Sequence, residues 1–247
     1  MDQILGIDVG ATGIKGAVVD LEKGTLVTER FKLPTPESGL PDDMIDVIYE
    51  IIEHFDWQGK NVGFGFPAII KNNKVCSASN IDKSWIGYKI KKQIESRTQC
   101  PCVIINDADA AGLAELHYGK GKDVKGTMIL LTLGTGIGSA IFNDGVLLPN
   151  TELGHLKYKD SIAEKYAANS ARKLKGLKWD EYGKELNEFL EHVDFIFSPN
   201  LILLGGGISK KFKNFSEYIS PDLNVSPAEK FNNAGIIGAA LAFEIYS

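Results

Sequence analysis

Two glycine-rich stretches of this sequence repeat one another about half a chain apart. The stretches are residues 6–24 and 131–148, and at a constant offset of 124 they match Asp8 with Thr132, Gly10 with Gly134, Ala17 with Ile141 and Asp20 with Asp144. In each stretch an apolar run enters a glycine turn and a second apolar run leaves it, which is typical of a β-hairpin. The repeat indicates an internal duplication, and it restricts the fold to two related domains.

The rest of the chain alternates between strand and helix patterns. Met44, Ile48 and Ile51 recur at helical spacing, so a helix lying on a sheet is expected over 41–56. The other expected elements are strands at 25–30, 61–70, 102–106 and 200–207, and helices within 85–98, 107–116, 161–175, 179–197 and 233–245. This order predicts an α/β fold. We expect a smaller domain of residues 1–117 with the C-terminal helix 233–247, and a larger domain of residues 118–232.

The two glycine turns are candidate phosphate-binding loops. Glycine after a strand lets a ligand approach the backbone more closely than a side chain would allow, and phosphate is the commonest such ligand. A tight hairpin with no ligand explains the same glycines. Two related domains that face each other would place both turns across one cleft, and ligands favour such clefts.

Composition and charge exclude several classes of protein. The 247 residues are 44% hydrophobic and 24% charged, which is typical of a soluble globular chain, and the net charge of -5 argues against a nucleic-acid surface. The lysine run at 89–92 is short, and we expect it to be solvated. No apolar stretch approaches the roughly 20 residues that span a bilayer. Because the chain enters a strand at once instead of a signal peptide, we expect a cytoplasmic protein with no membrane partner.

The three cysteines fit a reducing compartment better than a disulfide framework, because one is left over after any pairing. Cys100 and Cys102 stand too close in the sequence for ordinary zinc spacing. We expect both of them, and Cys76, to be small apolar fillers of the core, with metal binding a weaker alternative.

Six motifs give the chain a resemblance to a known family. They are 6-GIDVGATGIKGAVVD-20, 79-SNIDKSWIG-87, 106-NDADAAGLAE-115, 132-TLGTGIGSA-140, 149-PNTELGHL-156 and 205-GGGIS-209. In this order the motifs resemble those of ROK-type sugar kinases, in the actin-like ATPase and hexokinase superfamily, and most closely the polyphosphate glucokinases. The resemblance implies two actin-like, ribonuclease H-like domains with a cleft between them. It also implies transfer of a terminal phosphoryl group from inorganic polyphosphate, or from ATP, to the 6-hydroxyl of glucose.

The resemblance assigns the phosphoryl-transfer roles to single residues. Asp107 is the implied general base that accepts the proton of the sugar hydroxyl, although an aspartate that begins a helix also serves as a cap. Asp8 is the implied holder of hydrated Mg²⁺, with a solvated strand-end carboxylate as the alternative. The implied phosphate-binding residues are Gly10, Thr12, Lys15, Thr132, Gly134, Thr135, Gly136, Gly205 and Gly206.

Sugar recognition needs polar side chains that match the ring hydroxyls. From the residues alone, a satisfied buried imidazole is the preferred explanation of His155, and a loop carboxylate that of Glu152. Glu164 is also explained as part of a capping box opened by Ser161, and Trp85 lies either at the cleft entrance or in the core. The implied sugar-binding residues are Asn80, Asn106, Asp107, Glu152, His155 and Glu164.

The sequence departs from the family pattern at two places. Most ROK kinases carry a zinc-binding cysteine cluster before the helix that contains the counterpart of Glu164, whereas residues 155–164 contain no cysteine, so we expect no zinc. Ala11 stands where a second glycine is usual, which adds a methyl group to the first turn. The resemblance further implies a homodimer. It leaves two alternatives for function, an ATP-dependent glucokinase or glucomannokinase and a sugar-binding sensor without turnover.

Overall fold

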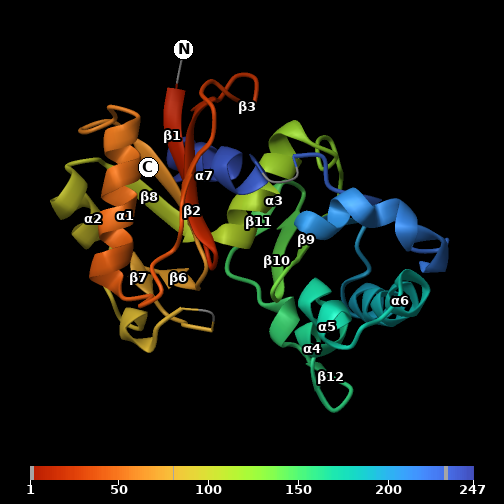
Figure 1. The fold of residues 1–247 in the computed structure, drawn as a ribbon. Helices are drawn as coiled ribbons and strands as arrows, with labels where there is room; N and C mark the ends of the chain where they lie inside the picture. The colour runs from red at the N-terminus through yellow and green to blue at the C-terminus, as the bar shows by residue number, and fades with distance from the viewer. Residues whose placement is uncertain (1–2, 80, 231–232) are drawn as a thin grey trace. The chain divides into compact units, whose positions relative to one another are not determined.

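The computed structural model describes residues 3–79, 81–230 and 233–247, and the chain forms two compact units (Figure 1). The first unit contains residues 1–114 and 233–247, and the second contains residues 115–232. Helices flank a mixed sheet in each unit, which confirms the expected α/β fold. Within the described residues, no helix is both long enough and apolar enough to cross a membrane.

The first unit is built on a sheet with the strand order β3-β2-β1-β5-β8, in which β4 also pairs with β2. The hairpin strands β1 and β2 are antiparallel, while β1, β5 and β8 are parallel to one another. The elements are β1 (Gln3–Gly10), β2 (Gly13–Asp20), β3 (Thr25–Leu26), β4 (Phe31–Leu33), α1 (Pro41–His54), β5 (Val62–Phe66), β6 (Ile70–Lys71), β7 (Lys74–Val75), η1 (Lys83–Trp85), α2 (Ile90–Thr98), β8 (Cys102–Asn106) and α7 (Ala234–Tyr246). The helix α3 (Asp107–Tyr118) begins in this unit and ends in the second.

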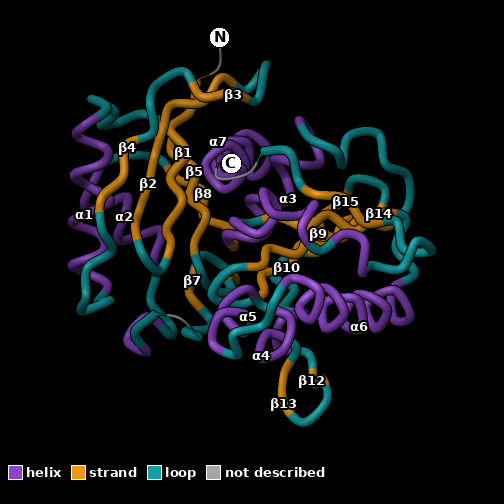
Figure 2. The backbone as a smooth tube through the Cα atoms, turned by 45° about the vertical axis from the view of Figure 1, so that its right-hand side comes forward, coloured by secondary structure: helices purple, strands orange, loops and turns teal. Residues whose placement is uncertain are grey.

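Side chains of β1 alternate between two covered faces of this sheet. Leu5, Ile7 and Val9 join a core with α1 and α2 on one face. The residues between them, Gly6 and Asp8, face α7 on the other face of the sheet. Figure 2 shows α1 and α2 on one side of this sheet and α7 on the other. This alternation follows from the two-residue period of a strand, and it sends the one acidic side chain of β1 toward α7.

The helix α7 lies directly on the backbone of the sheet. Every residue from Ala234 to Phe243 is buried, and most of them are glycine, alanine or isoleucine. Gly6 and Gly63 are neighbours on β1 and β5, and a β-carbon on either would collide with a backbone carbonyl of α7, that of Ile236 or of Ala239. These two glycines therefore form a flat surface against which α7 packs closely. The close packing explains why this apolar helix belongs to the first unit.

The second unit has a sheet with the strand order β11-β10-β9-β14-β15. Its core contains apolar residues of β9, β10 and β14, covered by Tyr182, Leu186 and Phe189 of the long helix α6. The elements are β9 (Thr127–Leu133), β10 (Ile137–Asn143), β11 (Val146–Leu148), η2 (Leu153–His155), β12 (Lys157–Tyr158), β13 (Ser161–Ile162), α4 (Glu164–Ala167), α5 (Asn169–Leu174), α6 (Trp179–Phe197), β14 (Leu201–Gly205), η3 (Gly207–Asn214), η4 (Ser216–Tyr218) and β15 (Val225–Pro227).

The two hairpins are duplicates, as the sequence offset predicts. Adding 124 to the bounds of β1 and β2 reproduces β9 and β10 to within one residue, and the two sheets have the same strand order. Their turns differ in length. Gly10 pairs with Gly13, which leaves two residues in the first turn, whereas Leu133 pairs with Ile137, which leaves three in the second. The pairing register of the second hairpin is therefore displaced by one residue.

Three expected elements are wrong in part. The strand at 61–70 ends at Phe66 in β5, and Ile70 begins β6, which pairs with β7 in a separate sheet. The strand at 25–30 is limited to Thr25–Leu26, and the chain pairs with β2 again only at residues 31–33. The single helix at 161–175 is replaced by β13, α4 and α5, with Ala168 in an extended conformation between the two helices. The break has a tertiary cause, because Ser170 of α5 donates its N–H to the Gly134 carbonyl at 3.0 Å.

Gly63→Ala tests the surface on which α7 lies. The new methyl group would collide with a backbone carbonyl that cannot rotate away, so we expect the free energy of unfolding to fall by about 3 kcal/mol or more. Gly65→Ala on the same strand is the matched control, because its methyl group would lie 3.3 Å from the Ala110 side chain. Urea unfolding measures both variants, and equal losses for the two would contradict this account.

Candidate functional site

Asp8 and Lys15 face each other across the hairpin of β1 and β2. Their side chains form an ion pair with an Nζ–Oδ2 distance of 2.9 Å, and they are 15% and 23% exposed, respectively. A charge that is largely removed from water needs a partner of opposite charge. The pair therefore explains how an apolar strand holds a carboxylate, and it places one anion and one cation near the turn.

The turn beyond this pair consists of the exposed residues Ala11 and Thr12. Neither has a positive φ, so the methyl group of Ala11 is accommodated without backbone strain. The Gly10 carbonyl accepts a hydrogen bond of 2.6 Å from the Thr35 hydroxyl, which fixes the start of the turn. Thr12 is therefore presented to solvent from an anchored loop.

Gly65 brings Asp8 and Asp107 to the same end of the first sheet. Asp8 pairs with Gly65 in the ladder of β1 and β5, and the Asp107 Cα lies 3.4 Å from where a β-carbon of Gly65 would be. A β-carbon on Gly235, in the first turn of α7, would collide with the Asp8 carboxylate. Because Gly235 has no side chain, the Asp8 carboxylate can lie next to the N-terminus of α7, where the helix dipole favours a negative charge.

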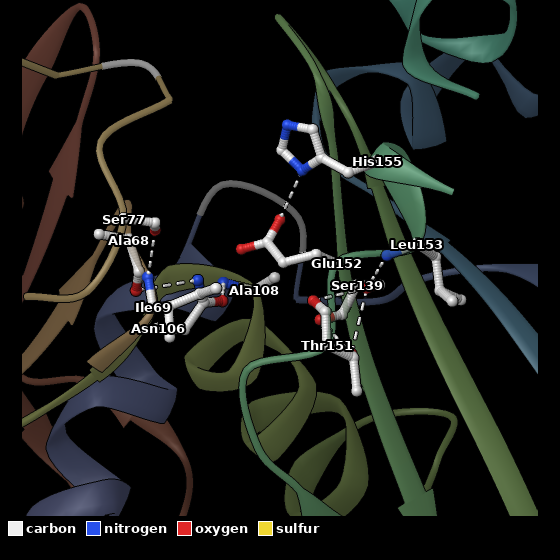
Figure 3. A network of polar contacts seen from close by, with 10 residues as sticks. All are labelled: Ala68, Ile69, Ser77, Asn106, Ala108, Ser139, Thr151, Glu152, Leu153 and His155. Atoms are coloured by element: carbon white, nitrogen blue, oxygen red, sulfur yellow. Dashed lines mark hydrogen bonds and ion pairs between the residues drawn. The ribbon is translucent and has the colours of Figure 1, made fainter. Parts of the chain in front are cut away.

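Asn106, more than Asp107, caps the helix α3. The Asn106 Oδ1 accepts the backbone N–H groups of Ala108 at 2.8 Å and Asp109 at 3.2 Å, and its Nδ2 donates to the Ala68 carbonyl (Figure 3). Asp107 accepts the Ala108 N–H at 2.8 Å and is half-buried. The buried Asn106 accepts the N–H groups of the second and third residues of α3, so Asp107 is not needed as the principal cap of this helix.

The segment that follows β7 contains one sugar-binding candidate and one aromatic residue. Asn80 lies outside the described residues. Trp85 is completely buried against Phe66 and Tyr88, and its Nε1 donates to the Gly39 carbonyl at 2.8 Å. Trp85 is therefore a core anchor of the first unit.

In the second unit, the turn of residues 134–136 is held in place by α5. The Ser170 N–H donates to the Gly134 carbonyl and the Ser170 hydroxyl donates to the Thr135 carbonyl at 2.5 Å. Gly205 pairs with Thr132 in the ladder of β14 and β9. Gly206 has a φ of 75° and lies against the backbone of Leu133. The structure therefore gathers the six phosphate-binding candidates of this unit at one end of its sheet. Within the turn, the Gly134 N–H donates to the Gly136 carbonyl at 3.0 Å.

Glu164 lies beside this turn. A β-carbon on Gly136 would collide with the Glu164 carboxylate, so the absence of a side chain at Gly136 admits it. The capping-box explanation is wrong, because Ser161 belongs to β13 and α4 begins after Ala163 without a side-chain cap. Glu164 is therefore available for a role other than capping.

Glu152 and His155 interact on the loop between β11 and β12. The His155 Nδ1 and the Glu152 Oε2 are 3.2 Å apart (Figure 3). Burial raises the pKa of Glu152 above its ordinary value of 4.5, the His155 hydrogen bond lowers it, and the negative charge of Glu164 raises it. Since Glu164 acts on Glu152, the three sugar-binding candidates of the second unit belong to one electrostatic group.

Ser139 and Thr151, which are not among the predicted site residues, anchor this loop. The buried Ser139 hydroxyl donates to the Thr151 carbonyl at 2.8 Å and accepts the Leu153 N–H at 3.0 Å (Figure 3). The Thr151 hydroxyl donates to the Ser139 carbonyl at 3.0 Å. These bonds fix the backbone on both sides of Glu152. The signal available in the sequence was a serine inside the apolar strand β10, where a buried hydroxyl requires partners.

The hairpin of β12 and β13, just before Glu164, is fastened to α6 by aromatic and charged contacts. Tyr158 packs edge-on against Phe189 and Tyr166. Lys159 forms ion pairs of 2.7 Å with Glu185 and 2.8 Å with Glu188. Such a network of partly buried ion pairs and rings is expected to hold the start of α4 in position.

The cysteines are free thiols with different environments. Cys100 and Cys102 are buried, as expected of core fillers, and burial raises the pKa of Cys102 to about 12. The expectation is wrong for Cys76, which is exposed because it follows the short edge strand β7. Among the described residues, no group of three or more His, Cys, Asp and Glu side chains is arranged to hold a metal ion.

Each unit thus carries a distinct chemistry. The first holds two carboxylates and a lysine at one end of its sheet. The second holds a glycine turn, suited to binding anions through backbone N–H groups, and a carboxylate and imidazole group suited to binding hydroxyls.

Comparison with known proteins identifies close relatives. A model of the ROK family matches residues 4–170. A polyphosphate glucokinase of Mycobacterium tuberculosis (strain CDC 1551 / Oshkosh) is 42% identical over 238 residues, which cover 96% of this chain and 89% of the relative. A polyphosphate glucokinase of Mycobacterium leprae is 39% identical over 96% of this chain and 73% of its own length.

Solved structures give the same result. The inorganic polyphosphate/ATP-glucomannokinase of Arthrobacter sp. strain KM has 44% identity and a TM-score of 0.96, with 100% of both chains covered. A ROK family glucokinase of Streptomyces griseus, solved with glucose and AMPPNP, has 24% identity and a TM-score of 0.82 over 97% of this chain and 98% of its own. The second likeness shows the fold alone.

Glu152→Gln tests the electrostatics of the loop. A carboxyl whose pKa is raised on folding contributes stability below its unfolded pKa, and that contribution is lost as pH rises through the folded pKa. We therefore expect the variant to be more stable than the wild type at neutral pH, and the difference to vanish below pH 4.5. Urea unfolding over a pH series measures this, with the exposed Glu22→Gln as a control. A variant less stable than the wild type at neutral pH would show that the His155 contact outweighs burial.

Proposed function

Since this chain belongs to the ROK family, we propose that it is a polyphosphate–glucose phosphotransferase. It transfers the terminal phosphoryl group of inorganic polyphosphate to the 6-hydroxyl of glucose, giving glucose 6-phosphate. The observation that carries the proposal is the end-to-end likeness to relatives whose names state a polyphosphate donor, at 42% and 44% identity. The proposal includes a homodimer in the cytoplasm that acts in carbohydrate metabolism.

On the acceptor side, Asp107 is the general base. Asn106 relieves Asp107 of most of the helix capping, which supports a carboxylate oriented toward the sugar hydroxyl. Asn80, Asn106, Glu152, His155 and Glu164 bind the other hydroxyls of the sugar. The raised pKa of Glu152 and its contact with His155 support hydrogen bonding to a neutral polyol.

On the donor side, phosphoryl transfer depends on positioning and on neutralisation of charge. Thr132, Gly134, Thr135 and Gly136 bind the donor phosphates, joined by Gly205 and Gly206. The bonds that Ser170 makes to the Gly134 and Thr135 carbonyls support a preorganised turn, whose backbone needs no rearrangement during the reaction. Gly10, Thr12 and Lys15 bind phosphate oxygens from the other hairpin.

Asp8 is the residue proposed to hold Mg²⁺ through water. Mg²⁺ keeps several waters and needs only one or two protein carboxylates when phosphates supply other ligands, so the single carboxylate at the end of β1 fits this ion. When bound, Mg²⁺ neutralises charge on the donor phosphates. Asp8 keeps its orientation through Lys15 and the space over Gly235.

A second candidate is favoured by the name of the Arthrobacter relative, which includes ATP and a glucomannokinase activity. In that case ATP also serves as donor and mannose as acceptor. The same phosphate-binding residues serve both donors, because they contact phosphates and leave the rest of the donor unspecified.

A donor and acceptor panel tests the proposed function, with Asp107→Asn as the companion variant. We expect glucose 6-phosphate from polyphosphate, and a kcat in the variant reduced by about 100-fold to 10,000-fold, as for loss of a general base. Glucose binding, measured by calorimetry, is expected to persist, because the Asn side chain still accepts the Ala108 N–H. Product from ATP alone would reject the polyphosphate donor. Glucose binding without product from any donor would favour a sensor, and unchanged turnover in the variant would reject the base.

Gly235→Ala tests the placement of Asp8. The added methyl group displaces the Asp8 carboxylate, and a misplacement of this size is expected to lower kcat by about 100-fold. Stability should be maintained, since alanine favours a helix by about 1 kcal/mol over glycine. Steady-state kinetics and thermal unfolding measure the two effects. A folded variant with wild-type kcat would show that the position of Asp8 does not limit the reaction.

A further inference from the structure

A hollow of about 250 Å³ in the first unit is lined mainly by basic side chains. Its lining residues are Asn72, Asn73, Lys74, Lys89, Lys91, Lys92 and Glu95, and we call it the lysine hollow. Four lysines against one glutamate give it a formal charge of +3, in a chain whose net charge is -5. Positive charge is therefore concentrated in this hollow, although the chain as a whole is negative. Such a local positive charge favours the binding of an anion.

The backbone around the lysine hollow is held by specific bonds. Asn72 and Asn73 have φ values of 51° and 60°, so the hairpin of β6 and β7 ends in a tight two-residue turn of the I′ kind. The Val75 N–H donates to the Tyr88 carbonyl at 3.1 Å, and the Gly87 N–H donates to the Val75 carbonyl at 2.8 Å. These bonds join the hairpin to the residues that lead into α2, so both walls of the hollow belong to one ordered substructure.

The lysines of α2 stand where a helix least favours them. Lys89 precedes the helix, Lys91 and Lys92 lie in its first turn, and this turn has neither an acidic residue nor a side-chain cap. The N-terminal end of a helix carries partial positive charge, so cations there are unfavourable and anions are stabilised. Natural sequences break such local rules mainly at functional sites. The arrangement therefore supports an anion that contacts these side chains.

Only part of this positive charge is neutralised within the protein. Glu95 forms an ion pair of 3.7 Å with Lys91 and also accepts the Cys102 N–H at 3.2 Å. Across the ranges that the structure describes, no ion pair involves Lys74, Lys89 or Lys92. Three ammonium groups from two separate elements are therefore available to one ligand.

We propose that the lysine hollow binds a distal segment of the polyphosphate donor, away from the phosphoryl group that is transferred. This inference rests on the proposed function. A linear anion with charge on every unit can contact lysines of the hairpin and of the helix at once, whereas a compact anion reaches fewer of them. Lysine suits this role, because its ammonium group is a point charge that binds phosphate oxygens without strict geometry.

The lysine hollow is connected to the proposed acceptor residues by a short length of chain. Ala68, whose carbonyl accepts a hydrogen bond from Asn106, precedes Asn72 by four residues. Four residues span at most about 13 Å at the strand rise per residue. A polyphosphate chain held at the hollow is thereby kept close to the first unit's site, and tethering at a second point raises the effective concentration of the reacting end.

The test compares donors of different length in the triple variant Lys74→Gln, Lys89→Gln, Lys92→Gln. Lys91 is kept because it pairs with Glu95. We expect the KM for polyphosphate of many tens of units to rise about tenfold, as for loss of a second attachment point. The KM values for tripolyphosphate, ATP and glucose are expected to change less than about twofold, because these ligands do not extend to the hollow.

The matched control removes the same charge from other exposed lysines, in the variant Lys120→Gln, Lys122→Gln, Lys125→Gln. All three lysines precede β9, at the opposite end of that strand from Gly134. The control is expected to keep the wild-type KM for every donor. Equal losses in both triple variants would indicate a general charge effect, and would overturn the inference.

The proposed function and the inference fail in distinguishable ways. A wild-type enzyme that uses long polyphosphate, with a KM unchanged in the Lys74, Lys89 and Lys92 variant, would reject the hollow and leave the function standing. A wild-type enzyme that uses ATP alone would reject the polyphosphate donor. In that event, equilibrium dialysis against long polyphosphate tests the lysine hollow separately. Polyphosphate bound by the wild type and not by the triple variant would support the inference, and no binding to the wild type would overturn it.

Discussion

The contact between α7 and the backbone of the first sheet is the constraint on which the rest of the first unit depends. Gly6 and Gly63 allow a helix to lie against strands at the distance of backbone atoms instead of side chains. That approach brings Gly235 over Asp8, and it lets Asp8 share one end of the sheet with Asp107. The position of Asp8 therefore depends on the missing side chains of Gly6 and Gly63, which let α7 approach this face of the sheet.

Duplication explains the framework of the two units, and divergence of the turns explains their different chemistry. The first hairpin has a two-residue turn, and it places the carboxylate of Asp8 opposite the ammonium group of Lys15. The second has one more residue in its turn, and its backbone is held by Ser170. At the same offset of 124, the pairing register of the second hairpin is shifted by one residue, which changes every pair of the ladder. The two hairpins therefore share strands and sheet order, whereas different side chains oppose one another near their turns.

Features set by local sequence were the most predictable. The strands of both hairpins follow from alternating apolar residues and from the offset, because each pairs residues that are close in the chain. Contacts between distant segments were not predictable from this pattern. The helix expected at 161–175 fails because Ser161 pairs in β13 and Ser170 bonds to the glycine turn, so tertiary hydrogen bonds override a helical pattern. The partner of Asp8 was also missed, because the opposition of Lys15 depends on register.

The dependence of the first unit on residues 233–247 has a consequence for biosynthesis. A ribosome releases the N-terminal strands long before α7, so the glycine surface of β1 and β5 waits uncovered while the whole second unit is translated. Asp8 cannot take its final surroundings until Gly235 arrives. The apolar surface of β1 and β5 must therefore be protected from other contacts until α7 has been made.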